Sequence, residues 1–188
     1  MAQIVVSGDT SGSCTLVAPA VSGSTVLTLP AVSGTVITNT AGVVTQAMLS
    51  TNVAGNGPAG SMYLTTAYAA PTSPAKVTGF TSSFNYGAMV DTVNNRLNIT
   101  VAGVYVVIIQ SAFTLTADVA IGFLFKNGAN IQTGQPAIGA GFGCKGFNVS
   151  ILNLSIGDYL EMYVQRGGTA CNIVAGDTYI SAAMVRSA

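Results

Sequence analysis

Charge is the property that this sequence has least of. The 188 residues include six basic and six acidic side chains, or 6% of the chain, whereas an ordinary soluble domain has roughly 25%. The net charge is zero, and no basic stripe is available to neutralise phosphates, so we predict no nucleic-acid partner. Histidine is absent, which excludes the usual zinc sites and the usual base of a nucleophilic triad.

Long hydrophobic runs are also missing, although 49% of the residues are apolar. The longest run, residues 101–109, contains Gly103 and is far shorter than the roughly 20 residues of a membrane span. Residues 1–9 have neither the basic region nor the long apolar region of a secretory signal. We therefore predict no membrane insertion and no secretion. The apolar surplus must be covered by protein, which favours interfaces between chains.

The residues that could carry chemistry are few and scattered. Cys14, Cys144 and Cys171 show no Cys-x-x-Cys spacing and are predicted to be free thiols. Asp158 and Glu161 are the closest carboxylate pair, but side chains three residues apart on a strand point to opposite faces. A glycosidase pair is therefore not expected, and Asp158 is better explained as a residue that closes a turn.

Residues 141–146, Gly-Phe-Gly-Cys-Lys-Gly, match the dinucleotide-binding pattern G-x-G-x-x-G. Phosphate binding by this pattern requires a helix after the loop, whereas residues 147–151 alternate like a strand. No calcium-binding loop pattern is present either. We therefore predict that the protein is not an enzyme and has no cofactor and no metal.

A tandem repeat dominates the first part of the chain. Pro-Ala-Val-Ser-Gly occurs at residues 19–23 and again at residues 30–34. Each copy combines a short β-prone run, a proline and a Ser-Gly turn, which is too little to bury a core. We interpret residues 1–60 as an extended arm that becomes ordered on a partner, with a disordered linker as the alternative. The predicted contact residues of this arm are Leu16, Pro19, Val21, Leu27, Leu29, Pro30, Val32 and Val36.

Short strands are expected within the arm at residues 4–6, 15–17, 26–29 and 36–38. Residues 61–75 are expected to form a hinge or loop, because the glycine-rich residues 55–60 precede them and residues 70–74, Ala-Pro-Thr-Ser-Pro, contain two prolines. From residue 76 onward the strands become longer and are separated by conventional turns. The strongest hairpin signal is Asn127-Gly128.

The segment that follows Gly103 is apolar on both faces of a strand. Tyr105 and Val107 would point to one side, and Val104 and Val106 to the other. A strand of a two-sheet sandwich normally has one solvated face, so the second apolar face is assigned to a neighbouring subunit. No segment shows helical periodicity, and about eight strands are expected over residues 76–188. The fold class is therefore all-β, with an extended arm followed by an antiparallel jelly-roll sandwich.

The order of short motifs in this second part resembles the jelly roll of the complement globular head and the tumour necrosis factor family. The matching pieces are Asn94-Asn95, Gly103-Val-Tyr105, Lys126-Asn-Gly128, Leu154-Ser-Ile-Gly-Asp158 and residues 179–185. That resemblance implies a homotrimer packed around a threefold axis. It places these residues among the candidates for inter-subunit contact: Tyr105, Val107, Tyr159, Tyr163 and Tyr179. The chain has no collagen-like stalk, so immune functions are not carried over.

Residues 27–36, Leu-Thr-Leu-Pro-Ala-Val-Ser-Gly-Thr-Val, resemble repeats of tailed-bacteriophage virion proteins. Together the two resemblances imply a trimeric decoration, or cement, protein that is made in the host cytoplasm and binds the major capsid protein on the virion surface. The alternative is a short tail or head fibre whose jelly-roll tip binds a host surface receptor.

Overall fold

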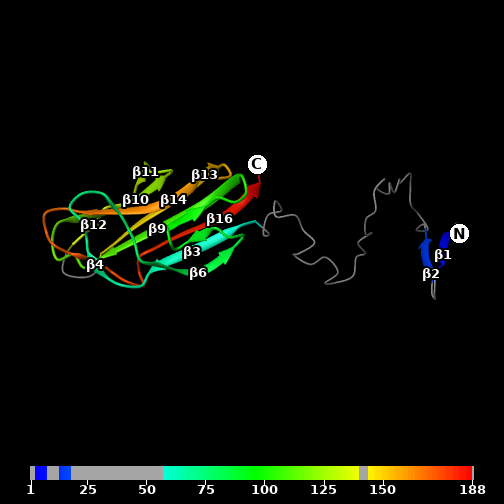
Figure 1. The fold of residues 1–188 in the computed structure, drawn as a ribbon, viewed down its shortest axis with the longest axis horizontal. Helices are drawn as coiled ribbons and strands as arrows, with labels where there is room; N and C mark the ends of the chain where they lie inside the picture. Colours follow the sequence, from blue (N-terminus) through cyan, green and yellow to red (C-terminus); the bar gives the residue numbers. More distant parts are fainter. Residues whose placement is uncertain (1–2, 8–12, 18–56, 140–143, 188) are drawn as a thin grey trace. The chain divides into compact units, whose positions relative to one another are not determined.

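The computed structural model describes residues 3–7, 13–17, 57–139 and 144–187 (Figure 1). The chain divides into two units, Met1–Val43 and Val44–Ala188. Every regular element in the described ranges is a strand, as the absence of helical periodicity predicted. No helix among these residues is long and apolar enough to cross a membrane.

The first unit contains one antiparallel pair of strands. These are β1 (Gln3–Ser7) and β2 (Ser13–Val17), with Gln3 opposite Val17. The pair confirms the strands expected at residues 4–6 and 15–17. Leu16 belongs to β2, whereas the other predicted contact residues of the arm lie outside the described residues: Pro19, Val21, Leu27, Leu29, Pro30, Val32 and Val36.

The second unit is a sandwich of two sheets. We call the first the β9 sheet, in which neighbouring strands follow the order β4, β15, β9, β16, β3 and β6, with β13 also paired to β9. Their bounds are β3 (Ala59–Leu64), β4 (Tyr68–Ala69), β6 (Phe80–Tyr86), β9 (Gly103–Phe113), β13 (Cys144–Leu154), β15 (Asn172–Ile173) and β16 (Tyr179–Ser187).

The second sheet of the sandwich, the β14 sheet, has the strand order β11, β10, β14, β8 and β7. Two short strands extend it, because β12 pairs with β10 and β5 pairs with β14. The bounds are β5 (Ala75–Lys76), β7 (Val90–Asp91), β8 (Arg96–Asn98), β10 (Val119–Lys126), β11 (Ala129–Thr133), β12 (Ala137–Ile138) and β14 (Tyr159–Arg166). All pairings in both sheets are antiparallel, which confirms the expected jelly-roll class.

The core lies between the two sheets and follows from alternation along their longest strands. On β9, residues 103, 105, 107 and 109 are buried while 104, 106 and 108 are partly exposed. On β14, Leu160, Met162 and Val164 are fully buried. Tyr105 adds a polar anchor, since its buried ring ends in a hydroxyl that donates to the Val101 carbonyl at 2.6 Å. Each strand therefore turns one apolar face towards the other sheet.

Asn127 and Gly128 connect β10 to β11, as the sequence predicted. Their φ angles are 53° and 79°, the left-handed conformation that a tight hairpin turn requires. Asn and Gly adopt this conformation at low cost, which explains their presence here.

The sandwich begins earlier than residue 76. β3 lies between β16 and β6, with Met62 opposite Ile180 and fully buried. Residues 59–64 are thus an internal strand of the β9 sheet, in a region where the sequence indicated the end of the arm and a hinge. The glycines near this point, read as hinge signals, instead permit close contacts: a Cβ at Gly60 would meet a Val90 methyl at 2.9 Å.

Candidate functional site

The outward side of β9 is apolar, although it does not face the core. Val104, Val106 and Ile108 point away from the second sheet and remain partly exposed. The alternate residues Tyr105 and Val107 are 0% and 1% exposed within the sandwich. This corrects the expectation that Tyr105 and Val107 contact another subunit, because their side chains are enclosed by their own domain. The sequence correctly predicted that both faces of this strand are apolar. It did not correctly predict which of the two faces points outward.

Residues 147–151 of the neighbouring strand β13 have their polarity inverted. Its outward residues Phe147, Val149 and Ile151 are exposed, whereas Asn148 and Ser150 point inward and are buried. An ordinary surface strand has the opposite pattern, with apolar residues inside. The alternation was visible in the sequence, but its orientation could not be read from it. An exposed apolar row on an otherwise well-folded sheet indicates an interaction surface.

Strand register joins these two rows into one patch. Val106 lies between Ile151 of β13 and Ala183 of β16, and Ile108 lies between Val149 and Ser181. Directly opposed residues in an antiparallel sheet share a face and are close neighbours. We define the β9 face as Val104, Val106, Ile108, Val149, Ile151 and Ala183.

The β9 face is also poor in charge. The seven strands of its sheet carry only Lys145 and Arg186. The β14 sheet, with the same number of strands, carries six charged side chains: Lys76, Asp91, Arg96, Lys126, Glu161 and Arg166. One side of the sandwich is therefore suited to water and the other to burial against protein.

A hollow of about 430 Å³ adjoins the β9 face where β3, β6 and β16 lie side by side. Tyr63, Tyr179 and several serines line it, and the Ser61 and Ser181 hydroxyls are hydrogen-bonded at 2.6 Å. Tyr179 is the one predicted interface residue on this side of the sandwich. Aromatic side chains with a polar end are common at the centres of protein interfaces.

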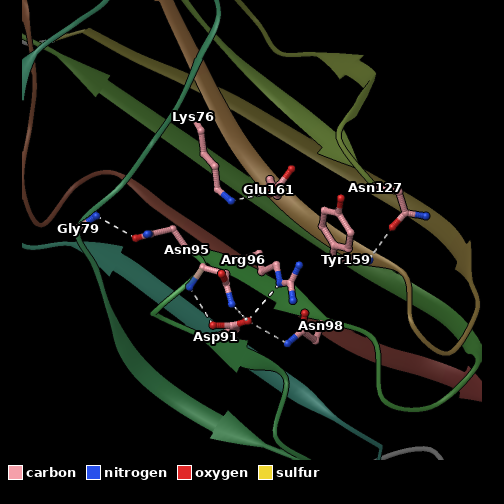
Figure 2. A network of polar contacts seen from close by, with 10 residues as sticks. Lys76, Gly79, Asp91, Asn95, Arg96, Asn98, Asn127, Tyr159 and Glu161 are labelled. Atoms are coloured by element: carbon pink, nitrogen blue, oxygen red, sulfur yellow. Dashed lines mark hydrogen bonds and ion pairs between the residues drawn. The ribbon is translucent and has the colours of Figure 1, made fainter.

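Tyr159 and Tyr163 lie on the opposite side, on the outward face of β14. The Arg96 guanidinium lies 4.7 Å from the centre of the Tyr159 ring, and the Tyr163 ring stacks on Phe125 at 3.8 Å. Figure 2 shows Arg96 and Tyr159 of this region, together with the ion pair between Lys76 and Glu161 at 2.5 Å. The five predicted interface residues therefore do not gather on one surface. The contacts of Tyr159 with Arg96 and of Tyr163 with Phe125 join β14 to the neighbouring strands β8 and β10.

Asp91 organises the turn between β7 and β8. The side chain and the backbone N–H of Asn94 donate to its carboxylate at 2.8 and 2.9 Å, and Arg96 donates at 3.1 Å (Figure 2). These hydrogen bonds, chiefly those from Asn94, lower the pKa of Asp91 to about 2. Hydrogen bonds to the charged form stabilise it, so the turn depends on an ionised Asp91.

Asp158 plays the corresponding role in the turn before β14. Burial alone would raise the pKa of this carboxyl, but Lys126, the Ser155 N–H and the Asn127 amide outweigh it and lower the pKa to about 2. The Ser155 N–H donates at 2.9 Å and Lys126 lies at 2.8 Å. This confirms Asp158 as a turn-closing residue. The Glu161 carboxylate likewise forms an ion pair, with Lys76.

No group of three or more His, Cys, Asp or Glu side chains that could hold a metal occurs within the described ranges. Residues 141–143 of the glycine motif lie outside those ranges, but β13 begins at Cys144. A strand rather than a helix thus follows the motif, as its flanking sequence predicted. Cys171 is a buried free thiol whose pKa is raised by desolvation.

No protein-family model and no curated protein sequence matches the chain. Among solved structures it is similar to the Eiger TNF of S. frugiperda, with a TM-score of 0.53 and 14% identity over 69% of this chain and 93% of that one. For murine APRIL at pH 5.0 the TM-score is 0.55, with 9% identity over 68% and 98% of the two chains. For the globular domain of zebrafish complement 1qA protein it is 0.52, with 11% identity over 70% and 100%.

Identities this low establish the fold and nothing more. The second unit is an all-β jelly-roll sandwich of the kind found in tumour necrosis factor and complement globular-head domains. The resemblance stated from the short sequence motifs is confirmed at that level.

Proposed function

We propose that the protein is a structural component that forms a homotrimer through its β9 face. The observation that carries this proposal is the inverted polarity of β13, which exposes Phe147, Val149 and Ile151 and buries Asn148 and Ser150. Leaving this row in water costs free energy at about 25 cal/mol per Å² of apolar area, which a second copy would recover. The low charge of the whole β9 sheet supports a protein partner. The resemblance to trimeric jelly rolls supports three copies.

The trimer would be tested by light scattering on the full recombinant chain. The expected mass is three times the 18.9 kDa of one chain. A stable monomer at micromolar concentration would contradict the proposal, because the β9 face would then be exposed in solution.

The proposed location is the outer capsid surface of a tailed bacteriophage, where the protein decorates and stabilises the shell. The sequence of residues 14–50 supports this, since its two Pro-Ala-Val-Ser-Gly units resemble virion repeats and cannot form a core of their own. The major capsid protein is the proposed partner of the arm. Assembly would follow synthesis in the host cytoplasm.

The proposed role is not catalytic. The chain has no histidine, and the two carboxylates closest in sequence hold Lys126 and Lys76 rather than pointing into a shared cleft. Nucleic-acid binding is not proposed because the positive charges are few and most are paired with carboxylates.

The location would be tested by separating purified heads from tails and identifying the protein in each by mass spectrometry. Decoration predicts the protein in heads. Its presence in tails alone would favour the alternative, a short fibre with the same trimeric jelly roll, and would overturn the capsid role.

A further inference from the structure

The outward side of the β9 sheet changes in side-chain size from strand to strand. Directly opposed residues share a face, so the register places one residue from each of five strands in a common row. From β13 through β9, β16 and β3 to β6, one row is Val149, Ile108, Ser181, Ser61 and Phe84, and the next is Ile151, Val106, Ala183, Ala59 and Tyr86. The side chains are large on β13 and β6, at opposite edges of the sheet, and small on β16 and β3 between them (Figure 1).

The small side chains form the floor of the hollow lined by Tyr63 and Tyr179. Its volume is about 430 Å³, and none of its lining residues is charged. The Ser61 and Ser181 hydroxyls are hydrogen-bonded to each other at 2.6 Å, so they depend less on a polar partner from outside. The hollow is therefore suited to apolar side chains.

The opposite edge of the same face carries a projecting row. We define the β13 ridge as Phe147, Val149 and Ile151, whose side chains are 46%, 49% and 73% exposed. Alternate residues of a strand lie about 7 Å apart, so the ridge is a row about 14 Å long. Val149 and Ile151 belong to the β9 face, which the hollow adjoins, so the ridge and the hollow are parts of one continuous surface.

The positions of the ridge and the hollow fit a ring of subunits. In a closed ring of three, each subunit meets its two neighbours through two different, complementary patches. The ridge projects, the hollow recedes, and β9 separates them on the sheet. Contact of one ridge with another would instead be self-complementary, which produces a twofold dimer.

We propose that the β13 ridge of each copy packs into the hollow between β16, β3 and β6 of the next copy around the trimer. This inference rests on the proposed trimer and adds which surfaces of two copies meet. Tyr63 and Tyr179 then cover the apolar side chains of the ridge with their rings and keep their hydroxyls at the rim. Phe84 and Tyr86 close the far side of the contact, since they lie on β6 opposite Ser61 and Ala59.

The test uses two full-length variants with one new cysteine each, Val149→Cys on the ridge and Ser181→Cys in the hollow. The two are expressed together, so that mixed trimers form, and are treated with a short bismaleimide cross-linker. We expect linked dimers in which mass spectrometry finds position 149 of one chain joined to position 181 of another. The original chain reports any linkage through Cys14, Cys144 and Cys171, and Ile156→Cys expressed with Ser181→Cys is the matched control.

A second variant tests the hollow without cross-linking. Ser181→Trp fills the space that the ridge is proposed to occupy and should raise the dissociation constant of the trimer at least about tenfold. Ser155→Trp, at an exposed position in the turn before β14, should leave it unchanged. Equal dissociation constants for Ser181→Trp and the original chain would overturn the proposed contact.

Failure of this contact is distinguishable from failure of the trimer. A monomer by light scattering would overturn the trimer itself. An intact trimer without the linkage between positions 149 and 181 would overturn the contact alone. The same holds for an intact trimer in which Val149→Cys expressed by itself is linked through position 149 of two chains, because the ridges would then meet one another.

Discussion

Replacing Ile151 by serine tests the β9 face where it is most exposed. Ile151 is 73% exposed in one chain, so its removal should leave the folding free energy of the isolated domain within about 0.5 kcal/mol. Full burial of an isoleucine side chain is worth about 1.5–3 kcal/mol, and the part still exposed here would contribute about 1.5 kcal/mol in each subunit.

Three subunits lose that contribution together when the trimer carries Ile151→Ser. The sum is about 4–5 kcal/mol per trimer, which corresponds to about a thousandfold increase in the dissociation constant for three chains. Sedimentation velocity over a dilution series measures this directly. We expect the variant to dissociate at concentrations where the original chain stays associated.

Ile156→Ser is the matched control. Ile156 is 71% exposed, nearly as much as Ile151, but it lies in the turn before β14 and outside the β9 face. Its replacement should leave the dissociation constant unchanged. A trimer of Ile151→Ser that dissociates no more readily than the original would contradict the proposed interface, and so would equal weakening of association by the two variants.

Three further predictions concern the fold. Tyr105→Asp places an unpaired charge at a position that is 0% exposed and should destabilise the domain by about 4 kcal/mol or more; an unchanged thermal melt would show that β9 is misplaced. Because the pKa of Asp91 falls from 3.8 to about 2 on folding, the ionised carboxylate stabilises the folded domain fully above about pH 4, and this stabilisation is lost as the pH falls towards 2. Between these pH values the original chain should lose on the order of 1 kcal/mol of unfolding free energy in acid melts, whereas Asp91→Asn has already lost it at neutral pH. Equal pH profiles of stability for the two proteins would contradict this. Lys76→Ala leaves the Glu161 carboxylate, which is 8% exposed, without its cation and should lower the unfolding free energy in urea by about 2 kcal/mol. Lys145→Ala, which removes an exposed ion pair, should lower it by less than about 1 kcal/mol. Similar losses in the two variants would show that burial does not strengthen the ion pair of Lys76 and Glu161.

The elements of the sandwich that depend on local chemistry could be predicted from the sequence. Asn127-Gly128 forms the expected hairpin because only such residues adopt two left-handed conformations in succession cheaply. Asp158 closes its turn through the Ser155 N–H. Residues 96–100 alternate between polar and apolar side chains, and the two apolar ones, Leu97 and Ile99, are buried.

The orientation of a strand that is apolar on both sides could not be predicted. Both rows of β9 satisfy the same pattern, so the sequence does not decide whether Tyr105 or Val106 faces the core. That depends on the neighbours: Leu152 lies opposite Tyr105 on the inward side, and the exposed Ile151 lies opposite Val106. The inverted polarity of β13 could not be predicted for the same reason. Its polar residues are buried because of the fold of the whole sheet and not because of any local preference.

We propose that the β9 face is covered by other copies of the chain. The most direct test of this is thiol labelling of Ile151→Cys and Ile156→Cys in the assembled protein, with mass spectrometry reporting which cysteine has reacted. We expect Cys at position 156 to react rapidly and Cys at position 151 to be protected until dilution dissociates the trimer. Equal labelling of both positions in an intact trimer would contradict it.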